Sequence, residues 1–353
     1  MGLPKISVIF KNIGATAVQR GAKGIVALVL EDVAAQKGQF TLTSVTDIPS
    51  GLSAENKSLL NLVFIGGDKA PFRVELYVTD KASPDYTAAL TYFETIKFDY
   101  IALPAINDAT KITVTAWVKG QRDSGHYVKA VLAKCAADYE GIINFATDNI
   151  KTKVATYSAA QYSVRIAGLL AGNAINTACT YQVLPEVIDV PHLTKSAADA
   201  LVDAGQLILY FDGKKVKCAR GVNSLVSITG DKSESWKKII VVDKMDLIAE
   251  DLIATAEDSY IGKVINNYDH KCLLVSAMNG YLQELAADEI VEKSSVAEID
   301  VLSQKNYLIS TGVDVTKMTD MQIKQAKTAD KVFISATVGI TDAMEDITIN
   351  VLS

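Results

Sequence analysis

Histidine and cysteine are the side chains best suited to acid–base, nucleophilic and metal chemistry, and this chain has three histidines and four cysteines. His126 follows a polar loop, His192 lies in a turn, and His270 starts a helix just after Asp269. We interpret these imidazoles as surface or helix-capping residues, and a catalytic role stays open only for His126.

The cysteines are too scattered to form a recognisable site. No Cys-x-x-Cys or Cys-x-x-His pair occurs, which argues against zinc and thioredoxin-type chemistry. We expect four buried, reduced thiols in a cytoplasmic product, at Cys135, Cys179, Cys218 and Cys272.

The motifs of the common enzyme classes are missing as well. The chain has no phosphate-binding Gly-rich loop ending in Gly-Lys-Ser/Thr, no Gly-x-Gly-x-x-Gly, no His-Glu-x-x-His and no Gly-x-Ser-x-Gly. We therefore predict a protein that is not an enzyme and has no cofactor and no metal. The alternative is an α/β enzyme or ligand-binding protein with a site at the strand end Leu103-Pro104.

Composition limits the remaining classes. The chain has 353 residues, of which 49% are hydrophobic and 22% charged, as expected for a globular protein of two or three domains. A net charge of -6 argues against nucleic-acid binding. The amino terminus lacks a secretory signal, and no segment reads as a membrane helix.

The alternation of strand and helix patterns predicts a mixed α/β fold. We expect a small α+β domain over residues 24–82, a layered α/β domain over 83–231 and a helix-rich C-terminal α+β domain over 232–331. Residues 1–23 form an N-terminal arm and linker, and residues 332–353 form the C-terminal strands and arm. We call these two ends the N-arm and the C-arm.

The two arms carry opposite charge. The N-arm contains four basic residues and no acid, whereas the C-arm contains Asp342, Glu345 and Asp346 and no base. Ile6, Val8 and Phe10 alternate along the N-arm, and Ile347, Ile349 and Val351 alternate along the C-arm, which is strand periodicity.

A terminal strand needs a neighbour for its backbone hydrogen bonds, and two arrangements are open. Both arms pair as edge strands of their own subunit, or each adds to the sheet of a neighbouring molecule. In the second arrangement Lys5 and Lys11 of the N-arm would favour the acidic C-arm as a partner, and Gly14, Gly21 and Gly24 are candidate hinges of the linker.

The order of several short patterns across the chain resembles the contractile phage tail sheath protein family. The patterns are Gly2-Leu3-Pro4-x-Ile6-x-Val8-x-Phe10, Arg20-Gly21-x-x-Gly24-Ile25-Val26, Phe98-Asp99-Tyr100-Ile101-Ala102-Leu103-Pro104, Gly141-Ile142-Ile143-Asn144, Gly221-Val222-Asn223-Ser224-Leu225, Tyr260-Ile261-Gly262-Lys263-Val264-x-Asn266 and Asp342-Ala343-Met344-Glu345-Asp346-Ile347. The compact length is similar to that of sheaths from simple phages and R-type bacteriocins of the diffocin kind.

The resemblance implies a structural subunit that stacks as hexameric rings around an inner tube and contracts to drive the tube through a cell envelope. It further implies a subtilisin-like middle domain without a working catalytic triad, and arms that insert into sheets of neighbouring subunits. The implied partners are other copies of the chain, the tube protein, the baseplate and the tail terminator, with no nucleic acid and no membrane insertion. Assembly would occur in the bacterial cytoplasm before release of the particle, and the sheath of a secretion-type injection system is the alternative within this class.

A basic segment near the C-terminus is a candidate contact with the tube. We predict a helix over Thr316–Ala329, on which Lys317, Lys324, Lys327 and Lys331 would share one face. The resemblance implies attachment to an acidic tube, and a solvated helix face is the alternative.

Overall fold

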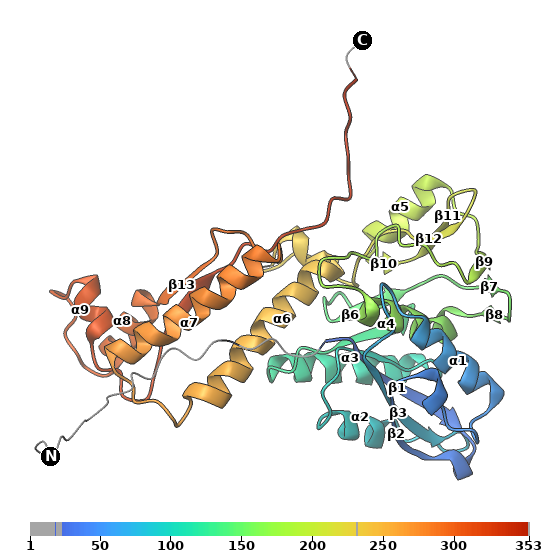
Figure 1. Cartoon of the computed structure of the whole chain (residues 1–353), viewed down its shortest axis with the longest axis horizontal. Coiled ribbons are helices and arrows are strands. Elements are labelled where there is room, and N and C mark those ends of the chain that lie inside the picture. Colours follow the sequence, from blue (N-terminus) through green and yellow to red (C-terminus); the bar gives the residue numbers. More distant parts are fainter. Residues whose placement is uncertain (1–17, 19–22, 231, 352–353) are drawn as a thin grey trace, which may run out of the picture. The chain divides into compact units, whose positions relative to one another are not determined.

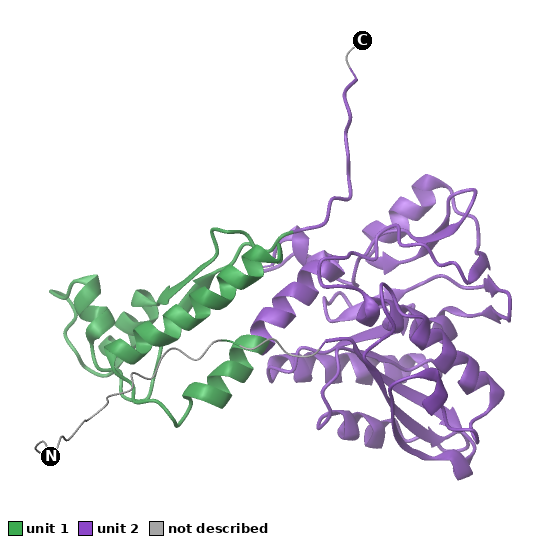
Figure 2. Ribbon diagram, in the orientation of Figure 1, with its two compact units in different colours: residues 1–20, 251–341 green, residues 21–250, 342–353 purple. Residues whose placement is uncertain are grey.

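The computed structural model describes Val18, residues 23–230 and residues 232–351, and these divide into two compact units. Unit 1 comprises residues 1–20 and 251–341, and unit 2 comprises residues 21–250 and 342–353 (Figure 2). The predicted N-arm strand and the candidate residues Lys5, Ile6, Val8, Phe10, Lys11, Gly14 and Gly21 lie outside the described residues.

Unit 2 is built on a seven-stranded sheet with the strand order β10-β6-β5-β4-β1-β3-β2. The strands are β1 (Ile25–Asp32), β2 (Gly38–Leu42), β3 (Arg73–Asp80), β4 (Tyr100–Ala102), β5 (Lys129–Ala133), β6 (Ile142–Phe145) and β10 (Gln206–Leu207). All neighbours pair in parallel except β2 and β3, which are antiparallel. The expected layered, largely parallel α/β sheet is therefore present.

Helices cover both faces of this sheet (Figure 1). They are α1 (Ala54–Ile65), α2 (Tyr86–Phe93), α3 (Asp108–Asp123) and α4 (Ala159–Gly172), whereas α5 (Lys195–Asp203) lies away from these faces and precedes β10. Alternate residues of β1 enter the two cores: Val26 and Leu28 pack in the core with α1 and α4, whereas Ala27 and Val29 pack in the core with α2 and α3. Period-2 alternation between two apolar faces is what a strand buried on both sides requires.

The sheet extends across the boundary expected near residue 82. β1, β2 and β3 come from the region predicted as a separate α+β domain, yet they join β4, β5 and β6 in one sheet. Local periodicity predicts where strands occur but not which strands pair, so the hydrophobic pattern could not predict the single sheet.

Smaller elements complete unit 2. β11 (Leu209–Phe211) and β12 (Val216–Cys218) form an antiparallel hairpin, and β8 (Thr156–Tyr157), β7 (Ile150–Thr152) and β9 (Val187–Asp189) form a three-stranded sheet. Short 3₁₀ turns cover Ala34–Gln36, Val45–Asp47 and Glu234–Lys237.

Unit 1 is helix-rich, as predicted. The division between the units falls inside α6 (Ile239–Thr255), which continues as a π-turn at Ala256–Tyr260. The other elements are α7 (Tyr268–Ala287), β13 (Val296–Ile299), α8 (Val301–Ser310), α9 (Asp320–Gln325) and β14 (Ile334–Thr337). β13 and β14 pair as an antiparallel two-stranded sheet. None of the described helices is long and apolar enough to cross a membrane.

Two predicted C-terminal elements differ from the structure. The helix expected over Thr316–Ala329 is limited to α9, because a capping box at Thr319 starts it and Ala326 takes an extended backbone. The strand expected over residues 347–352 is absent from the described part, residues 347–351, since none of the described strands pairs with this segment.

Candidate functional site

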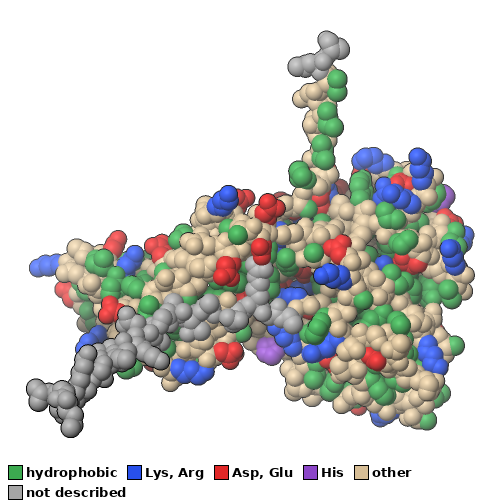
Figure 3. All heavy atoms as spheres, in the orientation of Figure 1, with side chains coloured by type: hydrophobic (Ala, Val, Ile, Leu, Met, Phe, Trp, Pro, Cys, Tyr) green, Lys and Arg blue, Asp and Glu red, His purple; other side chains and the backbone are tan. Residues whose placement is uncertain are grey.

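The distal C-arm, residues 342–353, divides into a segment that binds unit 2 and a segment that is exposed. Asp342, Glu345 and Asp346 all contact basic residues of unit 2. Beyond them, Ile347, Ile349 and Val351 have exposed fractions of 73%, 78% and 85%. Figure 3 shows hydrophobic side chains along this extended segment.

Three residues of unit 2 hold the acidic segment, and we call Thr180, Arg220 and Lys238 the C-arm clamp. Arg220 pairs with Glu345 through Nε (3.2 Å) and with Asp346 through Nη2 (2.5 Å). Lys238 Nζ lies 2.5 Å from Asp342 and 3.2 Å from Glu345. The Thr180 hydroxyl donates to Glu345 Oε1 at 2.5 Å.

These contacts hold both cations of the clamp in their charged form. A hydrogen bond to Asp346 raises the pKa of Arg220 despite its partial burial. Burial opposes the charged form of Lys238, but hydrogen bonds and charges from Asp342 and Glu345 outweigh it and raise the pKa. The acids of the C-arm thus have partners within their own unit.

One end of the N-arm is also paired within unit 2. Lys23 Nζ lies 3.0 Å from Glu250 and 3.2 Å from Asp99. Next to it, Gly24 has a positive φ of 97° and donates its N–H to Asp99 Oδ2, so this candidate hinge is held by a hydrogen bond. Val18 is 6% exposed and lines a pocket of about 850 Å³ in unit 1.

The first half of α6 is attached to unit 2 by a buried ionic network. Asp246 accepts two hydrogen bonds from Arg122 (2.8 Å each) and one from Lys129 (2.7 Å). Asp243 pairs with Lys129 at 3.1 Å and accepts the Tyr100 hydroxyl at 2.6 Å. Asp243, Asp246 and Glu250 are spaced by three and four residues and therefore share one helix face.

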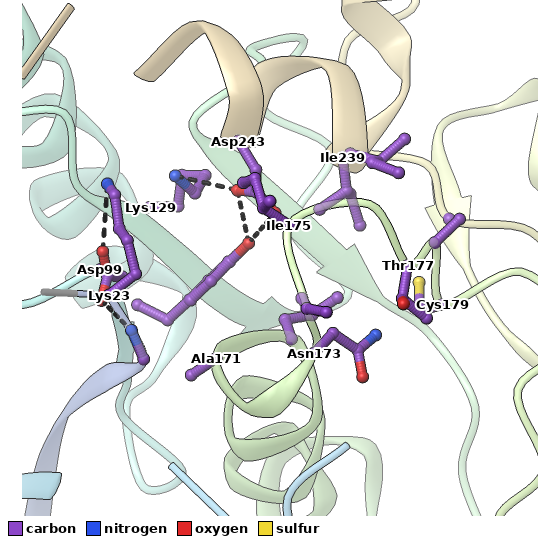
Figure 4. A pocket seen from close by; sticks show the side chains of 17 residues that line it. Lys23, Asp99, Lys129, Ala171, Asn173, Ile175, Thr177, Cys179, Ile239 and Asp243 are labelled. Carbon is purple, nitrogen blue, oxygen red and sulfur yellow. Dashed lines mark hydrogen bonds and ion pairs between the residues drawn. The ribbon is translucent and has the colours of Figure 1, made fainter. Parts of the chain in front are cut away.

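This network adjoins a small cavity of about 60 Å³ at the amino ends of β1, β4 and β5. Figure 4 shows its lining, with Lys23 joined to Asp99 and Lys129 joined to Asp243. It lies at the sheet edge opposite to Leu103-Pro104, where a ligand site was the alternative expectation.

The ionisable groups around this cavity pair with one another. Burial penalises the charge on Lys23, on Lys129 and on Asp246, but their partners outweigh it, so both lysine pKa values are raised and that of Asp246 is lowered. Burial raises the pKa of Tyr100 well above its usual value. None of these four groups changes protonation near neutral pH, so the arrangement is suited to fixing α6 rather than to acid–base chemistry.

The histidines are not assembled into a site either. His126 is exposed, His192 stacks on Phe211 and contacts Asp189, and His270 lies in the first turn of α7, which is capped by Asn267. Among the described residues, no group of three or more His, Cys, Asp or Glu side chains could hold a metal ion.

The cysteine prediction is right for two of the four thiols. Cys179 and Cys218 are buried, with their sulfur atoms 3.8 Å apart, whereas Cys135 and Cys272 are only partly buried. All four are free.

The candidate tube-contact lysines do not share one helix face. Lys324 lies in α9 and contacts Glu298 at 3.7 Å, whereas Lys317, Lys327 and Lys331 lie outside the helix and are exposed. The shortened helix removes the geometric part of the prediction, but the three exposed lysines still surround α9 in the sequence.

Sequence reasoning missed both the clamp and the ionic network. The three carboxylates at positions 243, 246 and 250, which share one face of a largely apolar helix, were a usable signal for the network. No local signal points to Thr180 or Arg220 as partners of residues more than 100 positions away.

Two family models match: the phage tail sheath protein central domain over residues 80–224 and the phage tail sheath C-terminal domain over residues 231–352.

Relatives extend the match over the whole chain. The tail sheath protein of Clostridium phage phiCD119 is 37% identical over 355 residues, covering 99% of each chain. The sheath tail protein of Desulfitobacterium hafniense has a TM-score of 0.72 at 20% identity, over 84% of this chain and 94% of that one. The helical sheath of the anti-feeding prophage in its contracted state has a TM-score of 0.73 at 15% identity, over 100% and 99% of the two chains.

This chain belongs to the phage tail sheath protein family. It is a contractile tail sheath subunit, and thus a structural tail component rather than an enzyme.

Proposed function

We propose that the chain polymerises as stacked hexameric rings around an inner tube, with the exposed part of the C-arm added to a sheet of a neighbouring subunit. The observation that carries this proposal is the exposed alternation of Ile347, Ile349 and Val351 in a segment that pairs with no described strand. A strand with an apolar face and free backbone groups gains both hydrogen bonds and burial when it joins a sheet edge.

The two-stranded sheet β13–β14 is the proposed acceptor. Two strands alone form a marginal sheet, and within the described residues each has only the other as a ladder partner. Addition of arms from neighbouring subunits would extend the sheet on both sides. The inner tube protein, the baseplate and the tail terminator complete the proposed set of partners, and contraction would drive the tube through a cell envelope.

Two variants test this proposal, one that lacks the N-arm and one that loses the apolar side chains of the C-arm. Deletion of residues 1–20, and separately the triple substitution Ile347→Ser, Ile349→Ser, Val351→Ser, should each leave a folded subunit that forms no sheath with the tube protein. Negative-stain electron microscopy measures sheath formation, and circular dichroism measures folding.

The matched control is Thr348→Ser with Asn350→Ser, on the opposite face of the same segment, which should assemble normally. Normal contractile sheaths from the arm variants would contradict the proposal. The same imaging of the unmodified protein distinguishes the two classes of protein. Long tubular polymers would support a sheath, whereas a small oligomer would support a soluble binding protein.

A further inference from the structure

The C-arm clamp joins three segments of unit 2 whose backbones are fixed by other contacts. Gly221, next to Arg220, donates its N–H to Thr180 Oγ1 at 2.9 Å, and Ile239, next to Lys238, donates its N–H to the Gly221 carbonyl at 3.0 Å. A β-bridge between Val222 and Lys238 also joins the segments that carry Arg220 and Lys238. The clamp side chains are thus positioned by the fold rather than by the arm that they bind.

Glu345 is the centre of the contact. Its side chain is 4% exposed and faces both cations. Because the Thr180 oxygen already accepts the N–H of Gly221, its own hydroxyl proton is free to donate to Glu345. A buried carboxylate without such partners would be strongly unfavourable. The burial of Glu345 therefore depends on the three clamp residues.

The neighbouring acids are more exposed and contribute less. Asp342 is partly exposed and Asp346 is largely exposed, and ion pairs in water add little. They bracket Glu345 on both sides, however, so the residues between 342 and 346 are held at three points. The exposed apolar side chains of Ile347, Ile349 and Val351 follow immediately afterwards.

We propose that the C-arm clamp keeps residues 342–346 attached to their own subunit, so that only the chain from Ile347 onward passes to a neighbour. The proposal rests on the arm exchange described above and specifies where the exchanged segment begins. It makes Thr180, Arg220 and Lys238 positioning residues of the arm.

This attachment point sets the reach of the arm. The five residues from 347 to 351 span at most about 18 Å when fully extended. If residues 342–346 were also free, Val351 could lie up to about 36 Å from the start of the arm. The sheet edge that receives Ile347–Val351 must therefore lie within about 18 Å of the clamp, which restricts the neighbour that this segment can reach.

Limited proteolysis of the full-length free subunit tests the clamp. A glutamate-specific endoprotease that cuts after Glu345 releases residues 346–353, which intact-mass spectrometry detects. We expect slow cleavage in the unmodified protein and at least about tenfold faster cleavage in Arg220→Ala, Lys238→Ala, because opening of the contact exposes Glu345.

The matched control is Lys217→Ala with Lys237→Ala, which removes two neighbouring positive charges that pair with Asp212 and Glu234 instead. It should be cleaved after Glu345 at the unmodified rate. If the alanine variant does not fold, Arg220→Gln and Lys238→Gln tested singly replace it, and Lys238→Arg should retain protection. Equal cleavage rates in the clamp and control variants would overturn the proposal.

The test of the clamp can fail independently of the test of arm exchange. Cleavage is measured on the free subunit, whereas sheath formation is measured by microscopy. Faster cleavage of the clamp variant together with normal sheaths from the Ile347→Ser, Ile349→Ser, Val351→Ser variant would uphold the clamp and reject arm exchange. Equal cleavage together with loss of sheaths in that triple variant would reject the clamp and uphold arm exchange.

Discussion

Asp246 accepts hydrogen bonds from Arg122 and Lys129 while almost fully buried, and it is the carboxylate on which the attachment of α6 most depends. Its partners come from α3 and β5, so one side chain joins a helix and a strand to α6. Loss of the Asp246 charge would leave Arg122 without its carboxylate partner and Lys129 with Asp243 as its remaining one.

We predict that Asp246→Asn lowers the free energy of unfolding by about 3–5 kcal/mol, because two buried cations lose their shared anion. Urea unfolding followed by circular dichroism measures the change. Asp203→Asn, at the exposed end of α5, is the control and should change stability by less than about 0.5 kcal/mol. A small effect at Asp246 would mean that the network is not a principal support of α6.

At the scale of elements, α1 and α4 pack closely because α4 carries glycines at the contact. A Cβ on Gly168 would lie 2.2 Å from the Val63 carbonyl oxygen, and a Cβ on Gly172 would lie 2.1 Å from the Lys69 carbonyl oxygen. The two glycines are one turn apart in the sequence, and their missing side chains allow this close approach.

Gly168→Ala should destabilise the protein by about 1–3 kcal/mol, since α1 and α4 must separate to admit the methyl group. Gly120→Ala in α3 is the matched control: nothing lies within 4 Å of its Cβ position. This control should stabilise the protein by up to about 1 kcal/mol through helix propensity. Thermal unfolding of both variants measures the two changes in stability. Equal changes would show that α1 and α4 can accommodate a methyl group at Gly168.

At the scale of the whole molecule, the basic residues around α9 are the remaining candidate for the inner-tube contact. Lys317, Lys327 and Lys331 are exposed and Lys324 is half-buried. The shortened helix places them on a turn, a short helix and a loop, so a contact would use their charge rather than a regular helix face.

We predict that Lys324→Glu with Lys327→Glu reduces sheath assembly on tubes at least about tenfold, because the reversed charges would repel an acidic tube surface. Electron microscopy of sheath-covered tube length measures the effect. Lys293→Glu with Lys305→Glu changes charge equally elsewhere in unit 1 and should assemble normally. If both pairs assemble normally, the tube is held by other residues.

The amino-acid sequence by itself determined most elements of unit 2, the helix-rich character of unit 1 and the absence of familiar catalytic motifs. These features follow from local periodicity and from residue types, which neighbouring positions report directly. Glycine endings such as Gly66 after α1 and caps such as Asp85 before α2 are likewise local chemistry.

Only the tertiary structure decided which distant residues meet. It joined β1–β3 to the central sheet, paired Asp246 with Arg122 and Lys129, and placed the acids of the C-arm against Arg220 and Lys238. It also ended α9 early and left residues 347–351 without a ladder partner among the described strands. Ion pairs and strand ladders join residues tens to hundreds of positions apart, and their formation depends on the packing of the whole fold rather than on any pattern near either partner.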